Sequence, residues 1–351
     1  MKEAVISGFD VSVDPTIAAW EALVAGHPYG HLLQTAPWGE FKAQWGWQPR
    51  RFTVGCDAGR GIAAQVLFRR LPLGRSVAYL PRGPVAAPGE PGALAALWAA
   101  IHPVARANGA VFLRVEPNWP EPVDLAALRQ AKFRPARHPI QPQTTILIDL
   151  RPALDEILTR MKAKWRYNIR LAERKGVTVR IGGADDFALY YELMRATGER
   201  DQFGVRPAGY YRDAWAAFQP DRSRFFIAEY AGQPLAALIA FRVGAMAWYL
   251  YGASSGRERN RMPNHALQWA AIQWAKAAGC EQYDLWGIPP EVPADRELAE
   301  EYGTGGLWGV YRFKQGFGGR VVNYPGSFDF VYSRPLYWAY QQVMAHRRAR
   351  D

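Results

Sequence analysis

An internal duplication constrains the fold of this chain more than any other feature of its 351 residues. One copy runs from Gly61 to Pro117 and the other from Gln233 to Pro289, and the tetrad Trp-Ala-Ala-Ile occurs in both, at Trp98–Ile101 and at Trp269–Ile272. A glycine follows each tetrad after seven or eight residues, at the place where glycine commonly ends a helix. Each copy therefore predicts a strand, a turn, a strand, a loop, a helix, a glycine and a strand.

Composition indicates a globular chain long enough for two domains, with 49% hydrophobic and 21% charged residues. The longest apolar run, about Leu235–Phe241, is far shorter than the roughly 20 residues of a membrane-spanning helix. Glu3 and Asp10 stand where an export signal needs apolar residues. We therefore expect a cytoplasmic protein.

The chain is strongly basic, with 43 Lys and Arg against 32 acidic residues and a formal net charge of +11. A GC-rich genome also enriches arginine, so the excess alone does not identify a partner. A basic surface suits partners that carry phosphate, namely RNA, nucleotides or anionic lipid.

The predicted order of elements resembles the core of the N-acetyltransferase (GNAT) fold. In that fold a basic, glycine-rich loop and the helix N-terminus after it hold the pyrophosphate of coenzyme A. The equivalent loops here, Ala87–Ala93 and Arg259–Ala266, lack that pattern. We predict an α/β (α+β) chain of two tandem GNAT-like domains, with mixed sheets flanked by helices and no coenzyme A. The first domain is expected at 1–147 plus 319–351 and the second at 148–318.

A basic segment, 155–175, joins the two copies and is predicted to form one amphipathic helix, because its apolar residues recur at helical spacing. It is either an ordinary solvated surface helix or a helix that contacts phosphate groups. Under the second interpretation four cations are the candidates for binding RNA: Lys162, Lys164, Arg166 and Arg170.

Five motifs, in order over almost the whole chain, resemble the FemABX family of non-ribosomal peptidyltransferases. They are Leu33–Lys42, Phe112–Pro117, Lys164–Arg170, Trp248–Ser255 and Tyr311–Gly319. No sustained heptad pattern is present, so the chain resembles the members that lack a coiled-coil arm.

This resemblance implies an aminoacyltransferase. Such enzymes move an amino acid from aminoacyl-tRNA to an amine of the stem peptide of a peptidoglycan precursor, UDP-linked (UDP-MurNAc-peptide) or lipid-linked (lipid II), and so form a cross-bridge. The family uses no cofactor, and we expect a monomer that contacts the inner face of the cell membrane peripherally. Two alternatives remain open: a coenzyme-A-dependent N-acyltransferase acting on another amine, and a non-catalytic relative that binds tRNA or the precursor.

The resemblance also implies catalytic residues. Lys314 and Phe313 match family residues that meet the 3′ end of the tRNA and the reacting ester, although Lys314 could also be a surface lysine. Glu116 precedes a proline where family members carry an acid that was a candidate general base. A structural carboxylate at the end of a strand is the other interpretation of Glu116.

For binding the precursor, Arg206 and Tyr210 match the family's diphosphate-binding pair, and Trp38 matches a tryptophan beside the sugar-peptide site. Some members have a lysine two residues before this tryptophan, where the present chain has Ala36. Tyr249 and Tyr251 are expected on one face of a strand, by its period of two, with a tyrosine of this strand at the acceptor peptide. Each of the four aromatic residues could instead be core, and Arg206 could be an ordinary loop arginine.

Two other motifs are set aside. Gly252–Gly256 reads G-x-S-x-G, but a nucleophile elbow needs a helix directly afterwards and a loop is predicted there. His27 and His31 are separated by a proline and a glycine, so we predict no metal site. The helix expected over 335–350 carries Leu336, Trp338 and Val343 before a cluster of cations, which would suit an anionic membrane surface or ordinary packing.

Overall fold

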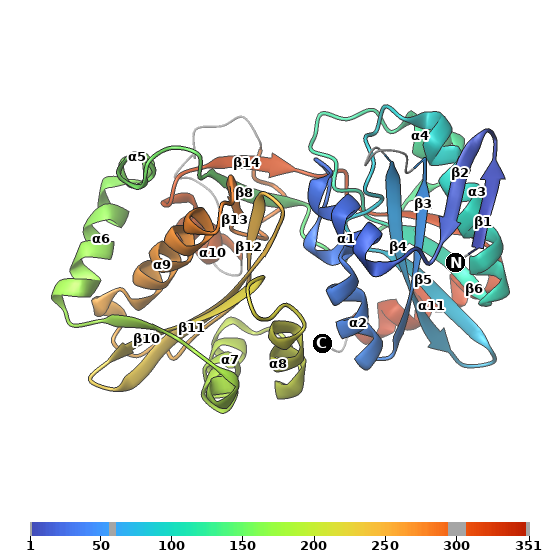
Figure 1. The fold of residues 1–351 in the computed structure, drawn as a ribbon. Helices are drawn as coiled ribbons and strands as arrows, with labels where there is room; N and C mark the ends of the chain where they lie inside the picture. Colours follow the sequence, from blue (N-terminus) through green and yellow to red (C-terminus); the bar gives the residue numbers. More distant parts are fainter. Residues whose placement is uncertain (1, 56–60, 294–306, 349–351) are drawn as a thin grey trace. The chain divides into compact units, whose positions relative to one another are not determined.

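The computed structural model describes residues 2–55, 61–293 and 307–348. The chain forms two compact units, unit 1 with residues Met1–Gln141 and Tyr324–Asp351 and unit 2 with Pro142–Asn323 (Figure 1). The expected boundaries at 147 and 319 both fall inside unit 2. The reason is that strand β8 (Thr144–Asp149) pairs with two other strands of unit 2 and is not a linker.

Unit 1 contains an eight-stranded sheet in the order β1-β2-β3-β4-β5-β6-β15-β7. Its elements are β1 (Lys2–Ile6), β2 (Phe9–Val13), α1 (Ile17–Gly26), η1 (Leu32–Gln34), α2 (Ala36–Gln44), β3 (Trp47–Val54), β4 (Ile62–Leu71), β5 (Arg75–Leu80), α3 (Pro91–Ala107), β6 (Ala110–Val115), α4 (Ala126–Gln130), β7 (Arg134–Pro135), β15 (Phe328–Val331) and α11 (Arg334–Arg348).

Unit 2 contains a seven-stranded sheet in the order β14-β8-β13-β12-β11-β10-β9. Its further elements are α5 (Leu154–Arg160), α6 (Ala163–Arg174), β9 (Thr178–Ile181), η3 (Ala184–Asp186), α7 (Phe187–Asp201), α8 (Ala208–Ala216), β10 (Ser223–Tyr230), β11 (Gln233–Val243), β12 (Met246–Ser254), η4 (Arg259–Arg261), α9 (Pro263–Ala277), β13 (Gln282–Asp284), α10 (Leu307–Gln315) and β14 (Arg320–Asn323).

The duplication is confirmed. Each unit contains two antiparallel strands, a helix and a strand parallel to the second: β4-β5-α3-β6 in unit 1 and β11-β12-α9-β13 in unit 2. Gly109 and Gly279 follow the two helices with φ of +66° and +81°, the left-handed conformation in which glycine is favoured. The prediction of two GNAT-like domains with mixed sheets is therefore correct.

The two copies differ at the parallel pair. In unit 1 the pairing of β5 with β6 runs on to Leu80 and Val115 at the ends of both strands. In unit 2 the pairing of β12 with β13 ends at Trp248 and Asp284. Beyond that point β12 continues beside β11, whereas residues 285–288 stay beside β8, through bonds from Leu285 N to Ile146 O and from Ile288 N to Thr144 O. The sheet of unit 2 therefore forks between β12 and residues 285–288.

The basic segment does not form the single helix that was predicted over 155–175. It forms α5 and α6, separated by Met161 and Lys162 (Figure 1). The amide of Lys162 donates to the carbonyl of Gly316 (2.9 Å), and the Arg166 guanidinium donates to the carbonyls of Thr159 (3.0 Å) and Met161. These bonds replace helical ones at the break, and the bond to Gly316 spans too much sequence for a local pattern to predict.

Unit 1 is closed by a buried ion pair between distant parts of the chain. Arg114 on β6 binds both carboxylate oxygens of Asp329 on β15, with N–O distances of 2.8 and 2.7 Å, and Tyr337 of α11 donates to the same carboxylate (2.7 Å). Asp329 is 2% exposed. Loss of one partner would leave a buried charge without compensation.

We therefore predict that Arg114→Ala lowers the free energy of unfolding of unit 1 by about 3–5 kcal/mol, measured by urea denaturation. Arg129→Ala is the matched control, because Arg129 and Asp124 form an exposed ion pair in the same unit. Equal, small effects of the two substitutions would contradict the prediction.

Candidate functional site

Lys314 lies at the fork in the sheet of unit 2. It stands in the last turn of α10, is 6% exposed, and is therefore no surface lysine. Its Nζ donates to the backbone carbonyls of Gly287 (2.8 Å) and Trp286 (3.2 Å), in the segment that leaves β13. The Nζ also lies 5.6 Å from the ring centre of Tyr249 on β12. Both arms of the fork therefore contact this one side chain.

The 286–287 segment is held in an unusual conformation that presents these carbonyls. Trp286 has a φ of +62°, in the left-handed region that side chains rarely adopt. Its amide donates to Asp284 Oδ1 (2.7 Å), and this buried carboxylate also accepts from the hydroxyl of Thr145. A Cβ on Gly287 would lie 2.7 Å from Pro142, so only glycine fits without a shift.

The burial of Lys314 changes its acid–base chemistry. Burial lowers the pKa of the ammonium to about 7, from an ordinary 10.5, while the nearby Asp284 carboxylate opposes the shift. Among the residues that the structure describes, Nζ is hydrogen-bonded by neutral carbonyls alone, so it can release a proton near neutral pH. A lysine of this kind can stabilise a developing negative charge and can also supply a proton.

Tyr249 and Tyr251 do not share a face of β12, so this prediction is wrong. The register pairs Ala240 with Tyr249 and Ile239 with Tyr251, so that Leu250 is an extra residue in a β-bulge. Neighbouring residues of β11 point to opposite faces, and their two tyrosine partners do the same. A bulge of one residue cannot be seen in an alternating sequence.

The bulge places each tyrosine in a different environment. Tyr249 faces the α9 side, where it bonds to the buried Gln268 and lies beside Lys314. A Cβ on Gly252 would lie 1.9 Å from the Tyr249 hydroxyl, so this glycine makes room for it. Tyr251 faces α8, where its ring lies 5.3 Å from that of Tyr211.

Arg206 and Tyr210 belong to the Tyr251 side. The Arg206 guanidinium lies 5.7 Å from the ring centre of Tyr210, and Tyr210 is hydrogen-bonded to Tyr251. Arg206 is exposed in the loop before α8, and its backbone amide donates to the Tyr211 hydroxyl (3.1 Å). The structure thus brings Arg206, Tyr210 and Tyr251 together on one face and Lys314 and Tyr249 on the other, with the fork between them.

Phe313, next to Lys314 on α10, belongs to an aromatic cluster. Its ring lies 5.2 Å from His265 and 5.1 Å from Phe317, and its carbonyl accepts from Trp165 Nε1 (2.9 Å). His265 bonds to Asn168 of α6 (3.1 Å). Burial and the charge of Lys164 lower the pKa of His265 to about 4, so this histidine is neutral.

Sequence reasoning missed His265 and Asn168. Together with Trp165 they attach the basic helix α6 to the turn that carries Phe313 and Lys314. A Cβ on Gly316 would lie 2.1 Å from the Trp165 ring, so the glycine in that turn is required by the contact. The sequence offered one signal of this contact, an asparagine (Asn168) inside the basic amphipathic segment.

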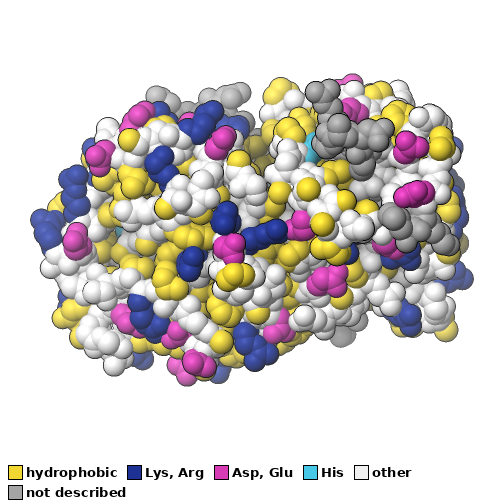
Figure 2. Space-filling view, viewed as in Figure 1, with side chains coloured by type: hydrophobic (Ala, Val, Ile, Leu, Met, Phe, Trp, Pro, Cys, Tyr) yellow, Lys and Arg dark blue, Asp and Glu magenta, His cyan; other side chains and the backbone are white. Residues whose placement is uncertain are grey.

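The four RNA-binding candidates differ in what they contact. Lys164 and Arg170 are exposed on α6, and Lys162 is exposed with its Nζ on Gln315 (3.2 Å). The Arg166 guanidinium is already used to cap α5, as described above. Figure 2 shows Lys and Arg side chains gathered along the left-hand edge, over the place of α6 in Figure 1.

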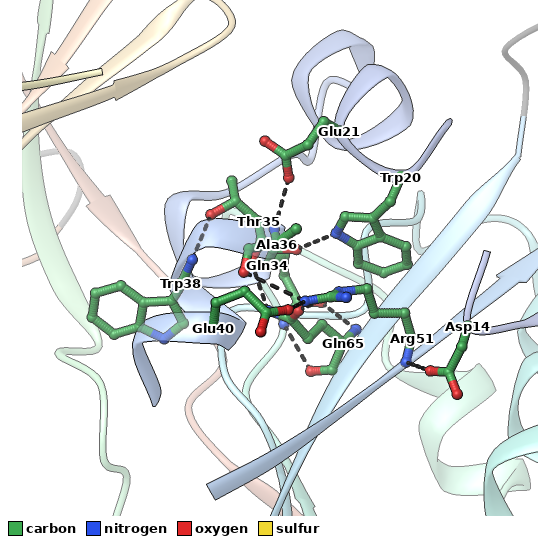
Figure 3. A network of polar contacts seen from close by, with 10 residues as sticks. All are labelled: Asp14, Trp20, Glu21, Gln34, Thr35, Ala36, Trp38, Glu40, Arg51 and Gln65. Carbon is green, nitrogen blue, oxygen red and sulfur yellow. Dashed lines mark hydrogen bonds and ion pairs between the residues drawn. The ribbon is translucent and has the colours of Figure 1, made fainter. Parts of the chain in front are cut away.

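Trp38 lies in unit 1, on α2, and is 7% exposed, with Phe41 beside it (ring centres 5.2 Å apart). The helix is positioned by a polar network (Figure 3). In it Trp38 N donates to Thr35 Oγ1 (3.3 Å), and Arg51 binds Gln65 (2.8 Å) and Glu40 (2.6 Å). This network fixes the start of α2 and with it the tryptophan.

At Ala36, where a lysine was considered, the backbone contacts one charge of each sign, and its carbonyl accepts from the Arg51 guanidinium (3.4 Å). The amide of Ala36 donates to the carboxylate of Glu21 (2.7 Å), as Figure 3 shows. A carboxylate at a helix N-terminus is favourable for the fold. The alanine side chain itself offers no cation to a diphosphate.

Glu116 is 3% exposed and is occupied by structural bonds. Its carboxylate accepts from the Tyr79 hydroxyl and from the amides of Ile140 and Gln141. Burial raises its pKa, and these bonds oppose the shift. The arrangement supports the structural interpretation of Glu116 rather than the general base, and it lies in unit 1 whereas Lys314 lies in unit 2.

Helix α11 only partly matches its expected apolar surface. Leu336 packs on the unit 1 sheet beside Val111, whereas Trp338 is 66% and Val343 52% exposed. The cations at 347–350 lie outside the side chains that the structure describes. Within the described ranges, no helix is both long and apolar enough to span a bilayer.

The loop before α9, where a coenzyme A site would lie, is engaged in internal contacts. Arg261 binds Glu258 (2.7 Å) and the carbonyl of Lys175 (2.8 Å), and its guanidinium stacks 3.4 Å from the ring centre of Tyr230. These contacts hold the loop against the end of α6. They do not favour the coenzyme-A-dependent alternative.

Two acetyltransferase-like halves, one with a buried lysine at a forked sheet, define a transferase built on a duplicated GNAT-like fold. A tandem GNAT protein from the clavulanic acid pathway has the same fold, with a TM-score of 0.51, 13% identity and coverage of 92% of this chain and 98% of that one. The chain matches the FemAB family over residues 16–124, 130–231 and 229–345, and it belongs to this family.

Individual proteins similar to this chain are consistent with the family assignment. The lipid II:glycine glycyltransferase of Staphylococcus aureus (strain USA300) is 27% identical over 401 aligned residues, which cover 92% of this chain and 93% of the relative. The alignment is longer than the chain, so the relative has insertions that this chain lacks. The crystal structure of FemX superimposes with a TM-score of 0.82 at 24% identity and covers 97% of this chain and 99% of FemX, which shows the shared fold.

The shifted pKa of Lys314 predicts a pH-dependent stability. The unfolded lysine keeps its proton up to about pH 10.5 and the folded one releases it near pH 7. Between these values the unfolded state binds more protons, so the free energy of unfolding rises with pH by up to about 1.4 kcal/mol per unit. Urea denaturation from about pH 7 to about pH 9 should show that the free energy of unfolding rises more steeply with pH for wild type than for Lys314→Met. Equal slopes for the two proteins would refute the lowered pKa of Lys314.

Proposed function

We propose that the protein transfers an aminoacyl group from aminoacyl-tRNA to an amine of the stem peptide of a peptidoglycan precursor and so builds a cross-bridge. Membership of the FemAB family and the named activity of the S. aureus relatives support the reaction class. The observation that carries the proposal is the buried Lys314 at the fork, next to candidate precursor-binding residues. Because those relatives are named for lipid II, we favour the lipid-linked precursor and a site of action at the inner face of the membrane.

The chemistry is the attack of an amine on an ester carbonyl. The new bond joins the amine nitrogen to the acyl carbon, and the carbonyl oxygen becomes an oxyanion. Its collapse breaks the bond between the acyl carbon and the ribose oxygen of the tRNA. The ribose oxygen leaves as a hydroxyl after gaining one proton, and the amine nitrogen loses one proton, so that a lysine that has donated its proton can be protonated again. Of the three N–H bonds of the Lys314 ammonium, two go to Gly287 and Trp286. The third has no hydrogen-bond acceptor among the described residues and would serve the oxyanion or the leaving oxygen. A pKa of about 7 suits the donation of that proton.

The two faces of the sheet at the fork would each bind one substrate. Arg206, with Tyr210 and Tyr251, suits the phosphate-bearing precursor, because a guanidinium donates two parallel bonds to phosphate. The ester would reach Lys314 and Phe313 from the side of α6 and α10. Attack then takes place between β12 and residues 285–288, where no strand pairing fills the sheet.

The proposal is tested by incubating the protein with a panel of radiolabelled aminoacyl-tRNAs, glycyl-tRNA included, and with lipid II or UDP-MurNAc-pentapeptide. We expect label in the stem peptide with at least one donor. Transfer from acetyl-coenzyme A and none from any aminoacyl-tRNA would overturn the proposal in favour of the acyltransferase alternative.

Two substitutions should separate catalysis from binding. Lys314→Ala is expected to lower turnover on the order of 100-fold and to leave precursor affinity nearly unchanged, because the contact forms with the developing charge. Arg206→Ala should weaken precursor binding by roughly 1.5–3 kcal/mol and keep turnover near normal at saturation. Steady-state transfer and calorimetry measure the two effects, and near-normal turnover of Lys314→Ala would reject its catalytic role.

RNA binding should depend on the exposed cations of α6. Lys164→Ala and Arg170→Ala are each expected to reduce the slope of log K against log salt by roughly 0.7–0.9, through one lost phosphate contact. Arg166→Ala is the comparison, because its guanidinium caps α5: it should lower the melting temperature and leave the salt slope unchanged. Filter binding of tRNA over a salt series decides, and three equal slopes would contradict this division.

A further inference from the structure

A cavity of about 520 Å³ lies in unit 2, beside the loop that follows Lys314. It is formed where α5, β8 and β14 meet. Its lining residues are Leu147, Ile148, Asp149, Arg151, Ile157, Arg160, Gln282, Phe317, Gly318, Gly319 and Arg320. The function proposed above makes no use of it.

The charged residues of its lining are three arginines and one aspartate. Arg151 binds both oxygens of Asp149 (2.8 and 2.9 Å). Arg160 lies 3.8 Å from the same carboxylate and forms its shorter ion pair with Glu156 of α5 (2.6 Å). Arg151 and Arg160 hold the pKa of Asp149 down at about 2. Arg320 is exposed and, within the described residues, has no ion-pair partner. With Arg151 and Arg160 paired to carboxylates, Arg320 supplies the positive charge that the described lining leaves for an anion.

The cavity wall is tied to the site at Lys314 by a short and well-anchored loop, residues 315–319. Lys162 fixes the loop twice, through its amide to the Gly316 carbonyl (2.9 Å) and through Nζ to Gln315 (3.2 Å). Gly319 has a φ of +91°, and a Cβ there would lie 2.5 Å from the carbonyl of Leu147. Six residue steps separate Lys314 from Arg320, so their Cα atoms are at most about 20 Å apart.

We propose that this cavity binds a phosphate group of the RNA strand whose 3′ end brings the ester to Lys314. The inference rests on the proposed function and adds a subsite to it. Guanidinium groups match phosphate oxygens in geometry and charge, and the buried Phe317 and Ile157 give the cavity an apolar floor. Its volume leaves room for part of the attached nucleoside.

A phosphate could also come from the diphosphate of the precursor. The position of the cavity favours RNA: Ile157 and Phe317 belong to the core on the α9 face of the sheet, the face of Lys314 and α6. Arg206 and Tyr210 lie with Tyr251 on the other face. The experiment must therefore measure both ligands.

The probe is a fluorescent RNA hairpin that reproduces the acceptor arm of a tRNA without an amino acid. With Arg320→Ala we expect several-fold weaker binding at low salt and a salt slope reduced by roughly one. Arg320→Lys keeps the charge but loses the two parallel N–H donors of the guanidinium. Its RNA affinity should therefore fall between those of wild type and Arg320→Ala. Arg195→Ala removes the same charge from the exposed surface of α7 and should bind RNA like wild type. Unchanged thermal unfolding shows that the variants are folded.

Calorimetry with UDP-MurNAc-pentapeptide and inorganic pyrophosphate forms the second arm, and neither affinity should change in Arg320→Ala. A loss of precursor or pyrophosphate affinity in place of RNA affinity overturns the RNA assignment. Unchanged RNA binding by Arg320→Ala, with wild type active in transfer, overturns the subsite and leaves the proposed function standing. RNA binding that depends on Arg320 in a protein without transfer activity supports the subsite and refutes the function. Wild type that binds no RNA refutes both.

Discussion

The burial of one ammonium group organises the part of unit 2 where its sheet forks. Lys314 is placed where two arms of a sheet separate, and its proton is held by two carbonyls that the chain can present only because Trp286 adopts a left-handed conformation and Gly287 lacks a side chain. Removing an ammonium from water is costly unless its donors are satisfied. The need to satisfy these donors therefore constrains three segments together: the one after β13, the turn after α10 and the start of α6.

Much of the architecture could be predicted from the sequence, because short local patterns in each copy of the duplication indicate its strands and its helix. The order of strands and helix in each copy, and the glycines that end the helices, depend on neighbouring residues. The break between α5 and α6 depends instead on the bond from Lys162 to Gly316, about 150 residues away. Long-range contacts of this kind override a helical period.

The candidate site was predicted by residue type but not by arrangement. The family resemblance pointed to Lys314, Tyr249 and Tyr251, yet the bulge at Leu250 sends the two tyrosines to opposite faces. Glu116 is buried by contacts with Tyr79 and with the amides of residues 140–141. These partners are distant in the sequence, so the position of Glu116 at the end of a strand does not predict them. The two copies also differ at the parallel pair: in unit 1 these strands stay paired to their ends, whereas in unit 2 they separate after Trp248 and Asp284.

The closing of unit 1 by Arg114 and Asp329 has a consequence for the order of folding. The two residues are 215 positions apart, and the whole of unit 2 is inserted between them. Unit 2 is continuous in the chain, so it leaves the ribosome complete while unit 1 still lacks β15 and α11. Once unit 2 is folded, the long insertion acts as a compact body instead of a free loop, and the entropy lost when β15 pairs with β6 is smaller than the sequence separation suggests. Folding of unit 2 during synthesis would thus bring the two separated parts of unit 1 close together and help that unit to complete its sheet.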